Sequence, residues 1–324
     1  MKRIALAIAF ILSLNVSSIW AERLRVGEPT GSEMSTNANS GVRTIKAPRF
    51  ARPLVEKWIS EYAKVEPGIQ FIIAKGSQQD IDLNVVFDNQ EANTKDFSHI
   101  VYFGETAVLP ITARSSEAAR LLEGKHLNSK RLKQLFFLND DLEEDTKRNK
   151  LFEQIIIYSG SNTSSVASSF AHNFGEESSS FRGKRISGDD LFLNTALSKD
   201  PLGVSFNALP NIFDLKSRHV KDELTIIGLD LKKGLAESIN DEGSLDNVLL
   251  QLENGKPAEI AIEKVGISYH VADDAVSHFL EWVLENGTQY NHEFGLLNLD
   301  QKVTQAQINQ VKTHLTAQRL RVGE

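Results

Sequence analysis

The sequence predicts an α/β protein built of two lobes. Short apolar runs typical of strands alternate with segments of helical periodicity along most of the 324 residues. A single hydrophobic core rarely grows beyond about 250 residues, so a chain of this length favours two. The segments between the expected elements are short, which favours lobes joined by several strands over two domains in series.

The first 21 residues have the pattern of a secretory signal peptide. A basic start, Met1-Lys2-Arg3, precedes an aliphatic run at 4–14 and small residues up to Ala21. The run is much shorter than the roughly 20 residues that cross a bilayer. We therefore expect cleavage after Ala21, export to the periplasm and a flexible leader at 22–40, with a buried N-terminal helix as the alternative.

Composition narrows the class of protein. There is no cysteine, so a large exported domain would depend on its core rather than on disulfides. The formal net charge is −7 and no basic tract occurs, which argues against a nucleic-acid partner. No later apolar run approaches transmembrane length, and a soluble mature chain is expected.

The apolar pattern of the sequence predicts a series of helices and strands. After Pro53, apolar residues recur at helical spacing from Leu54 to Tyr62 and predict a helix that ends at 66–68. The runs at 153–158, 203–206 and 260–265 resemble strands buried on both faces, as in a mainly parallel sheet. Further strands are expected at 69–73, 100–103 and 107–112, and further helices at 116–122, at 130–137 and up to Phe174.

Two loops carry groups that could bind an anion. The segment 157–165 (IYSGSNTSS) places hydroxyls and unpaired backbone N–H groups at a helix start, where the helix dipole favours negative charge. Ordinary N-capping by Ser and Thr is the alternative. Lys75-Gly76-Ser77-Gln78 is a similar turn after a strand, and a plain turn is its alternative.

Signatures of catalysis and metal binding do not occur. The chain has no Gly-x-Ser-x-Gly elbow, no His-x-x-x-His pair and no Gly-x-x-x-x-Gly-Lys-Ser/Thr loop. Adjacent acids such as Asp140-Asp141, Asp189-Asp190 and Asp273-Asp274 are interpreted as solvated loops or helix starts. The sequence therefore predicts a protein that is not an enzyme and that holds neither a metal nor a cofactor.

Five short segments in one order, spread over most of residues 44–300, resemble the phosphate-type (PstS-like) substrate-binding proteins of ABC transporters. The closing region is the most specific of them, with Phe279, Trp282, Gly287 and Tyr290 at the family's spacing. The others are Phe50-Ala51-Arg52-Pro53-Leu54 with Trp58, Lys75-Gly76-Ser77, Gly160-Ser161-Asn162-Thr163, and Asp200-Pro201-Leu202-Gly203-Val204-Ser205-Phe206.

The resemblance implies two α/β lobes with mixed sheets and two hinge crossings. Lobe one would comprise 41–108 and 260–318, lobe two 109–259, with the first crossing at 108–112. It implies a monomeric periplasmic receptor that captures a small oxyanion, phosphate first, for an ABC permease in the inner membrane. The residues matched to ligand contacts are Arg49, Phe50, Gly76, Ser77, Gly160, Ser161, Asn162 and Thr163.

The sequence departs from the family pattern beside the helix-start loop. Ile157 stands where the family usually has an arginine, Ser159 replaces an acid, and Asn162 replaces a glycine. We expect Arg49 to supply the missing positive charge, with a solvated arginine as the alternative. Two other functions stay open: a sensing or partner-binding homologue without anion transport, and a secreted hydrolase.

Overall fold

The computed structural model describes residues 41–75, 80–88, 99–138, 149–161, 164–270 and 273–322. For Ser165 and for 314–322 only the backbone is described. The predicted signal peptide and leader, at 1–21 and 22–40, lie outside the described residues. Within the described part of the chain, no helix combines the length and the apolar composition that crossing a membrane requires.

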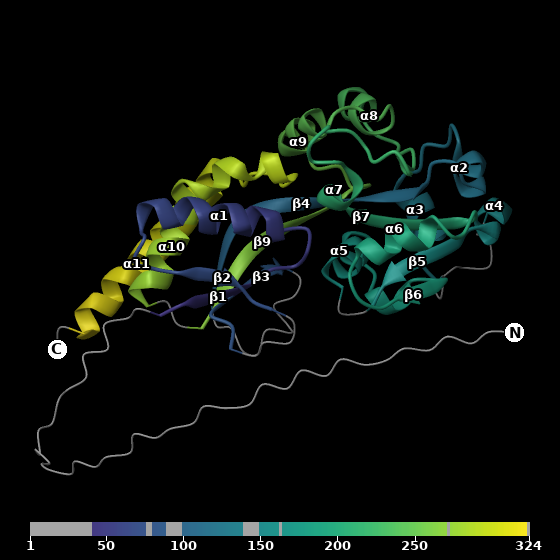
Figure 1. The fold of residues 1–324 in the computed structure, drawn as a ribbon. Helices are drawn as coiled ribbons and strands as arrows, with labels where there is room; N and C mark the ends of the chain where they lie inside the picture. The colour runs from purple at the N-terminus through teal and green to yellow at the C-terminus, as the bar shows by residue number, and fades with distance from the viewer. Residues whose placement is uncertain are drawn as a thin grey trace, which may run out of the picture. The chain divides into compact units, whose positions relative to one another are not determined.

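The described strands form one mixed nine-stranded sheet (Figure 1). Its order is β2-β1-β3-β9-β4-β7-β5-β6, and β8 pairs with the far end of β4. The strands are β1 (Arg43–Lys46), β2 (Phe71–Ile73), β3 (Leu83–Phe87), β4 (His99–Ala113), β5 (Ile156–Gly160), β6 (Lys184–Ile186), β7 (Gly203–Ala208), β8 (Leu224–Ile226) and β9 (Ala261–Tyr269).

Parallel pairs lie at both ends of the sheet, and antiparallel pairs lie at its centre. β1 runs parallel to β2 and β3, and β5 runs parallel to β6 and β7. β9 is antiparallel to β3 and β4, and β4 is antiparallel to β7. The expectation of a mainly parallel sheet, drawn from buried strands, is therefore wrong at the centre, where β4 and β9 connect the two ends.

β4 is one strand, whereas the sequence predicts two. The polar interruption at Gly104-Glu105-Thr106 suggests a break, yet Glu105 and Thr106 pair with Lys264 and Glu263 of β9. A register shift between Tyr102 and Gly104 absorbs the irregularity. The Glu105 carboxylate can be buried in the strand because Lys256 Nζ lies 2.6 Å from both of its oxygens.

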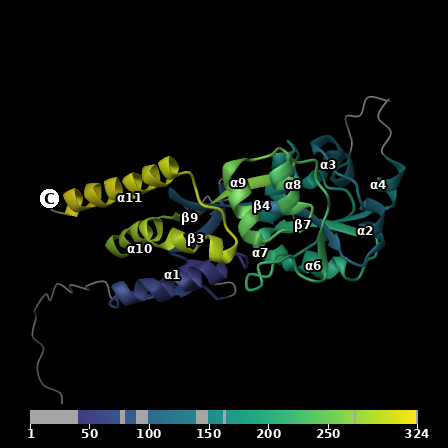
Figure 2. The ribbon, with the colours of Figure 1, turned by 90° about the horizontal axis from the view of Figure 1, so that it is seen from above.

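The helices cover the two ends of the sheet. In Figure 1, α1, α10 and α11 lie beside β1–β3, whereas α3, α5 and α6 gather around β5–β7, and Figure 2 shows α1, α10 and α11 at the opposite end from α3 and α6. Below, lobe one denotes the first group, and lobe two denotes the second group together with α2, α4, β8, α8, α9 and the segment 213–223 before β8. The helices are α1 (Arg52–Val65), α2 (Glu117–Leu122), α3 (Ser129–Phe136), α4 (Lys150–Gln154), α5 (Ser165–Asn173), α6 (Leu191–Leu197), α7 (Leu209–Ile212), α8 (Lys233–Ile239), α9 (Leu245–Asn254), α10 (Asp274–Glu285) and α11 (Gln301–Val322), with short 3₁₀ turns η2 (Ser178–Ser180), η3 (Gly287–Tyr290) and η4 (His292–Phe294).

α1 confirms the helix predicted after Pro53. Proline stands in its first turn, where no N–H partner is needed, and the apolar stripe is buried at Leu54, Val55, Trp58 and Tyr62. Trp58 Nε1 donates to the Gly287 carbonyl oxygen at 2.8 Å, which joins the start of the chain to its closing region.

The strand expected at 153–158 begins later, at Ile156. Glu153 and Gln154 belong instead to α4, whose N-cap Asn149 accepts a hydrogen bond from the Leu151 amide at 3.0 Å. This cap starts a short helix. The helix is not evident from the sequence, because the adjoining run of isoleucines favours a strand. Lobe two is then filled by six buried phenylalanines, namely Phe136, Phe137, Phe170, Phe174, Phe181 and Phe206.

Candidate functional site

The predicted anion loop lies between β5 and α5. β5 ends at Gly160, and the Ser161 carbonyl oxygen accepts a hydrogen bond from the Ser164 amide at 2.9 Å. Ser164 caps α5, since its Oγ accepts from the Ala167 amide at 3.2 Å. N-capping, the alternative considered from the sequence, is therefore present and is provided by Ser164.

A half-buried carboxylate adjoins this helix start. Ser164 Oγ donates to Asp190 Oδ1 at 2.6 Å, and Asp190 immediately precedes α6. Asn207 Nδ2 donates to the Asp190 carbonyl oxygen at 2.9 Å. Burial raises the pKa of the Asp190 carboxyl, the Ser164 hydrogen bond opposes that rise, and the nearby Asp189 charge adds to it.

Gly160 allows the loop to close on itself. A Cβ at this position would lie 2.6 Å from Ser164 Cβ, 2.7 Å from Ser164 Oγ and 3.3 Å from Asp190 Oδ1. Those separations are shorter than van der Waals contact, so a larger residue would displace Ser164 from Asp190. Glycine at this position is thus required by the contact between β5 and the starts of α5 and α6.

Arg49 reaches this loop cluster from lobe one. It lies in the turn that leads from β1 to α1, where the amides of Ala51 and Arg52 donate to the Pro48 carbonyl oxygen. Its Nη1 is 3.5 Å from Asp189 Oδ2, and its side chain is 62% exposed. The other carboxylate oxygen of Asp189 accepts from the Leu191 amide at 2.9 Å, at the start of α6. The ion pair therefore joins the turn before α1 to the helix starts of lobe two.

The other predicted site residues are not seen in this loop cluster. The Phe50 side chain is buried against Phe87, with ring centroids 5.2 Å apart, so it is a core group in lobe one. Gly76, Ser77, Asn162 and Thr163 lie outside the described residues, and their ligand contacts stay predictions.

Sequence reasoning missed the roles of Ser164, Asp189 and Asp190. The adjacent acids before an apolar segment were interpreted as solvated or as a helix start, and the helix start is correct. The contacts of Asp190 have no local signal, because Ser164, which donates to its carboxylate, and Asn207, which donates to its carbonyl oxygen, are distant in sequence.

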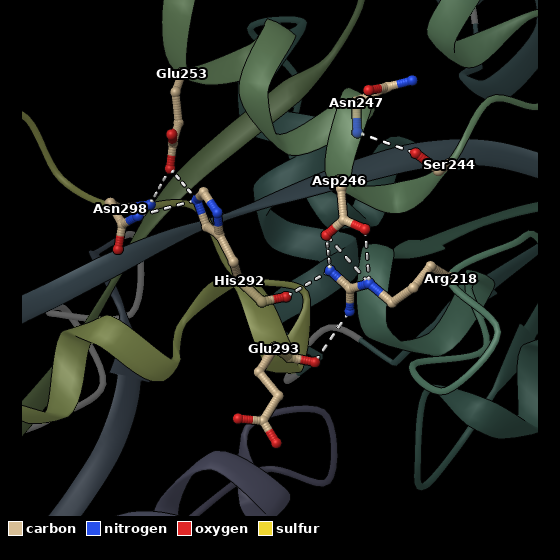
Figure 3. Close-up of polar contacts among 8 residues, drawn as sticks. All are labelled: Arg218, Ser244, Asp246, Asn247, Glu253, His292, Glu293 and Asn298. Carbon is tan, nitrogen blue, oxygen red and sulfur yellow. Dashed lines mark hydrogen bonds and ion pairs between the residues drawn. The ribbon is translucent and has the colours of Figure 1, made fainter.

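A second polar cluster connects the lobes through the closing region (Figure 3). Arg218 Nη2 lies 2.6 Å from Asp246 Oδ1 of α9 and 2.8 Å from the His292 carbonyl oxygen, and Nη1 donates to the Glu293 carbonyl oxygen at 3.1 Å. Glu253 Oε1 accepts from the Asn298 amide at 2.6 Å. Side chains of lobe two thus hold the backbone of 292–298.

Among the described residues, no metal site accompanies these clusters. In the ranges that the structure describes, no group of three or more His, Asp or Glu side chains is arranged to hold a metal ion. The chemistry that the loop cluster can offer is therefore hydrogen bonding and charge, from Arg49, the α5 helix start and two carboxylates.

The fold resembles solved phosphate-transport proteins. A candidate phosphate ABC transporter substrate-binding protein of Clostridium perfringens, solved with bound phosphate, matches at a TM-score of 0.56 with 12% identity, over 80% of this chain and 100% of that chain. An ABC-type phosphate transport receptor of Vibrio cholerae matches at 0.52 with 11% identity, over 80% and 100%. No protein-family model matches the sequence. No curated protein matches it either.

Identity this low shows the fold alone. These matches confirm the predicted two-lobed α/β binding-protein fold and the predicted resemblance at the level of the fold. The described strands form one mixed sheet rather than a separate mixed sheet in each lobe. These neighbours are binding proteins rather than enzymes. The domain boundaries predicted from the sequence stay predictions.

The raised pKa of Asp190 predicts how stability depends on pH. The protonated carboxyl is favoured in the folded state, so its contribution is present below the ordinary pKa, 3.8, and is lost as pH rises through the raised value. Asp190→Asn keeps an acceptor for Ser164 and removes the charge. We expect the free energy of unfolding of Asp190→Asn, relative to the parent, to increase with pH above about 4 and then level off.

Urea unfolding from pH 3.5 to 7 measures this difference. Burial also raises the pKa of Glu263, but Glu263 is present in both proteins and cancels. A difference between the two proteins that stays constant over the whole range would show that Asp190 is not the responsible group.

Proposed function

We propose that this protein is a periplasmic solute-binding protein that captures a small oxyanion, phosphate first, and delivers it to an ABC permease as a monomer. The supporting observation is the ion pair between Arg49 and Asp189, which brings the cation of lobe one to the helix starts of lobe two. An anion at the same place would lie between a guanidinium and the N-terminus of α5, both of which favour negative charge.

The two carboxylates favour an oxyanion that carries a proton. Asp189 and Asp190 lie beside the loop, and an unprotonated dianion such as sulfate would meet repulsion from both. An oxyanion with a P–O–H group can instead donate a hydrogen bond to a carboxylate oxygen. Such a site therefore favours phosphate over sulfate, because sulfate has no proton to donate and would leave the carboxylate oxygen without a hydrogen bond.

Titration calorimetry with inorganic phosphate, sulfate, molybdate and vanadate tests the proposal. We expect Arg49→Ala to lose about tenfold in phosphate affinity, which corresponds to about 1.4 kcal/mol. Arg49→Lys should recover only part of the loss, since an ammonium cannot present two parallel donors. Arg52→Ala is the matched control, because Arg52 pairs with Glu56 along α1 at 3.0 Å.

Asp189→Asn is the companion variant. In the structure the Asp189 carboxylate pairs with the Arg49 guanidinium that would bind the anion. The anion would therefore compete with Asp189 for Arg49. Removing the charge should raise phosphate affinity several-fold and reduce the discrimination against sulfate. Unchanged affinity in both Arg49→Ala and Asp189→Asn would contradict this placement of the site, and a parent protein that binds no oxyanion at millimolar concentration would refute the function.

The same ion pair supports the second candidate, a sensing or partner-binding protein of this fold without anion transport. Arg49 is already paired with a carboxylate from the opposite lobe, so the lobes can contact each other without a bound anion. If this second candidate is correct, neither the parent protein nor Asp189→Asn binds an oxyanion. The calorimetric series therefore separates the two functions.

A further inference from the structure

A cavity of about 540 Å³ lies in lobe two, away from the loop cluster that contains Arg49. Its walls come from α2, the segment 123–126, β8 with the two residues that follow it, and 240–241 after α8. Figures 1 and 2 show α2 and α8 on the lobe-two side of the molecule, apart from α1 and α10. Cavities of this size hold amino acids, short peptides and other small molecules.

One ion pair and several hydrogen bonds join the segments that surround the cavity. Arg114 Nη1 lies 2.8 Å from Glu242 Oε2, and Thr225 Oγ1 donates to Glu242 Oε1 at 2.8 Å. The Leu127 amide donates to the Gly228 carbonyl oxygen at 2.9 Å. A Cβ on Gly228 would lie 2.8 Å from the Lys125 carbonyl oxygen, so the segment at 125–126 packs directly against residues 227–228, which follow β8.

The lining of the cavity carries charges of both signs. Arg120 and Lys125 are the cations, and Glu123 and Asp241 are the anions. Among the residues that the structure describes, none of these four side chains has an ion-pair partner, although all four line one cavity. Arg114, by contrast, has its charge balanced by Glu242.

Unpaired opposite charges around one cavity define the chemistry of a ligand. A molecule with a carboxylate and an ammonium could bridge the two cations and the two anions, which do not reach each other directly. Ala119, Leu122, Ile226 and Ile227 supply apolar wall between the charges. We propose that this cavity binds a zwitterion with an aliphatic side chain, an amino acid or a short peptide with free termini.

Calorimetry with L-leucyl-L-leucine tests the proposal, with its N-acetyl and C-terminal amide derivatives as probes that each lack one charge. We expect the free dipeptide to bind at least tenfold more tightly than either derivative. Arg120→Gln with Lys125→Gln should abolish the preference over the amide, and Glu123→Gln with Asp241→Asn should abolish the preference over the acetylated form.

The control replaces exposed charges elsewhere, Lys216→Gln with Glu66→Gln, and should bind the free dipeptide like the parent. Arg49→Ala should also bind it unchanged, which separates this cavity from the proposed oxyanion site. Equal affinity for the free and blocked dipeptides, no saturable binding by the parent, or an equal loss in the control would each overturn the proposal.

Discussion

Phe170→Ala should reduce the free energy of unfolding by about 3–5 kcal/mol. Phe170 is fully buried in α5, and its ring stacks on Phe206 with centroids 4.3 Å apart and an interplanar angle of 5°. Phe136 approaches edge-on at 4.8 Å. Truncation removes these aromatic contacts and leaves a cavity that the neighbouring rings cannot fill, out of a total stability on the order of 5–15 kcal/mol.

Equilibrium urea unfolding measures the loss, and Phe192→Ala is the control. Phe192 lies in α6 with 49% of its surface exposed, so its truncation should change stability by no more than about 0.5 kcal/mol. Phe170→Leu should lose much less stability than Phe170→Ala, because leucine keeps most of the side-chain volume of phenylalanine. Equal losses in Phe170→Ala and Phe192→Ala would show that the phenylalanine cluster does not organise lobe two.

Arg218→Ala should cost about 2–3 kcal/mol, because it leaves three acceptors without their charged donor. The acceptors are the Asp246 carboxylate and the carbonyl oxygens of His292 and Glu293 (Figure 3). The Arg218 side chain is only 19% exposed, whereas that of Asp246 is 60% exposed. Most of the effect should therefore come from the two backbone acceptors rather than from the ion pair.

Asp246→Asn separates the two contributions. It removes the carboxylate charge and keeps the shape, and we expect a loss below about 1 kcal/mol. Arg218 also has φ of 65°, which costs about 1 kcal/mol for a residue with a Cβ. Arg218→Gly should thus be more stable than Arg218→Ala in urea unfolding. A loss in Asp246→Asn as large as that in Arg218→Ala would contradict this account.

Elements with strong local signals were predictable from the sequence. The α1 stripe from Leu54 to Tyr62 repeats at helical spacing, and the structure buries that face. β4 was divided in two because Gly104 and Glu105 interrupt its apolar pattern. The compensating contacts, from Lys256 and from the Leu297 backbone, come from distant segments that no local pattern reveals.

The candidate site shows the same division. The Gly160-Ser161 loop followed from its position between a strand and a helix start. The pairing of Arg49 with Asp189 did not, because it depends on how the two lobes approach each other. Ile157 is fully buried, so this position supplies packing in lobe two rather than charge.

The continuity of β4 has a mechanical consequence. Near Gly104 both edges of the strand are paired, because β9 lies along one edge and Glu105 exchanges backbone hydrogen bonds with Leu297 at 2.9 Å along the other. At Val108 its partners change from β9 to β7. Between these two places, over about 10 Å from Glu105 to Val108, β4 stays paired with β9 at every residue. We therefore expect this short, paired connection to bend and twist only through small angles, which would limit how far one lobe can rotate against the other.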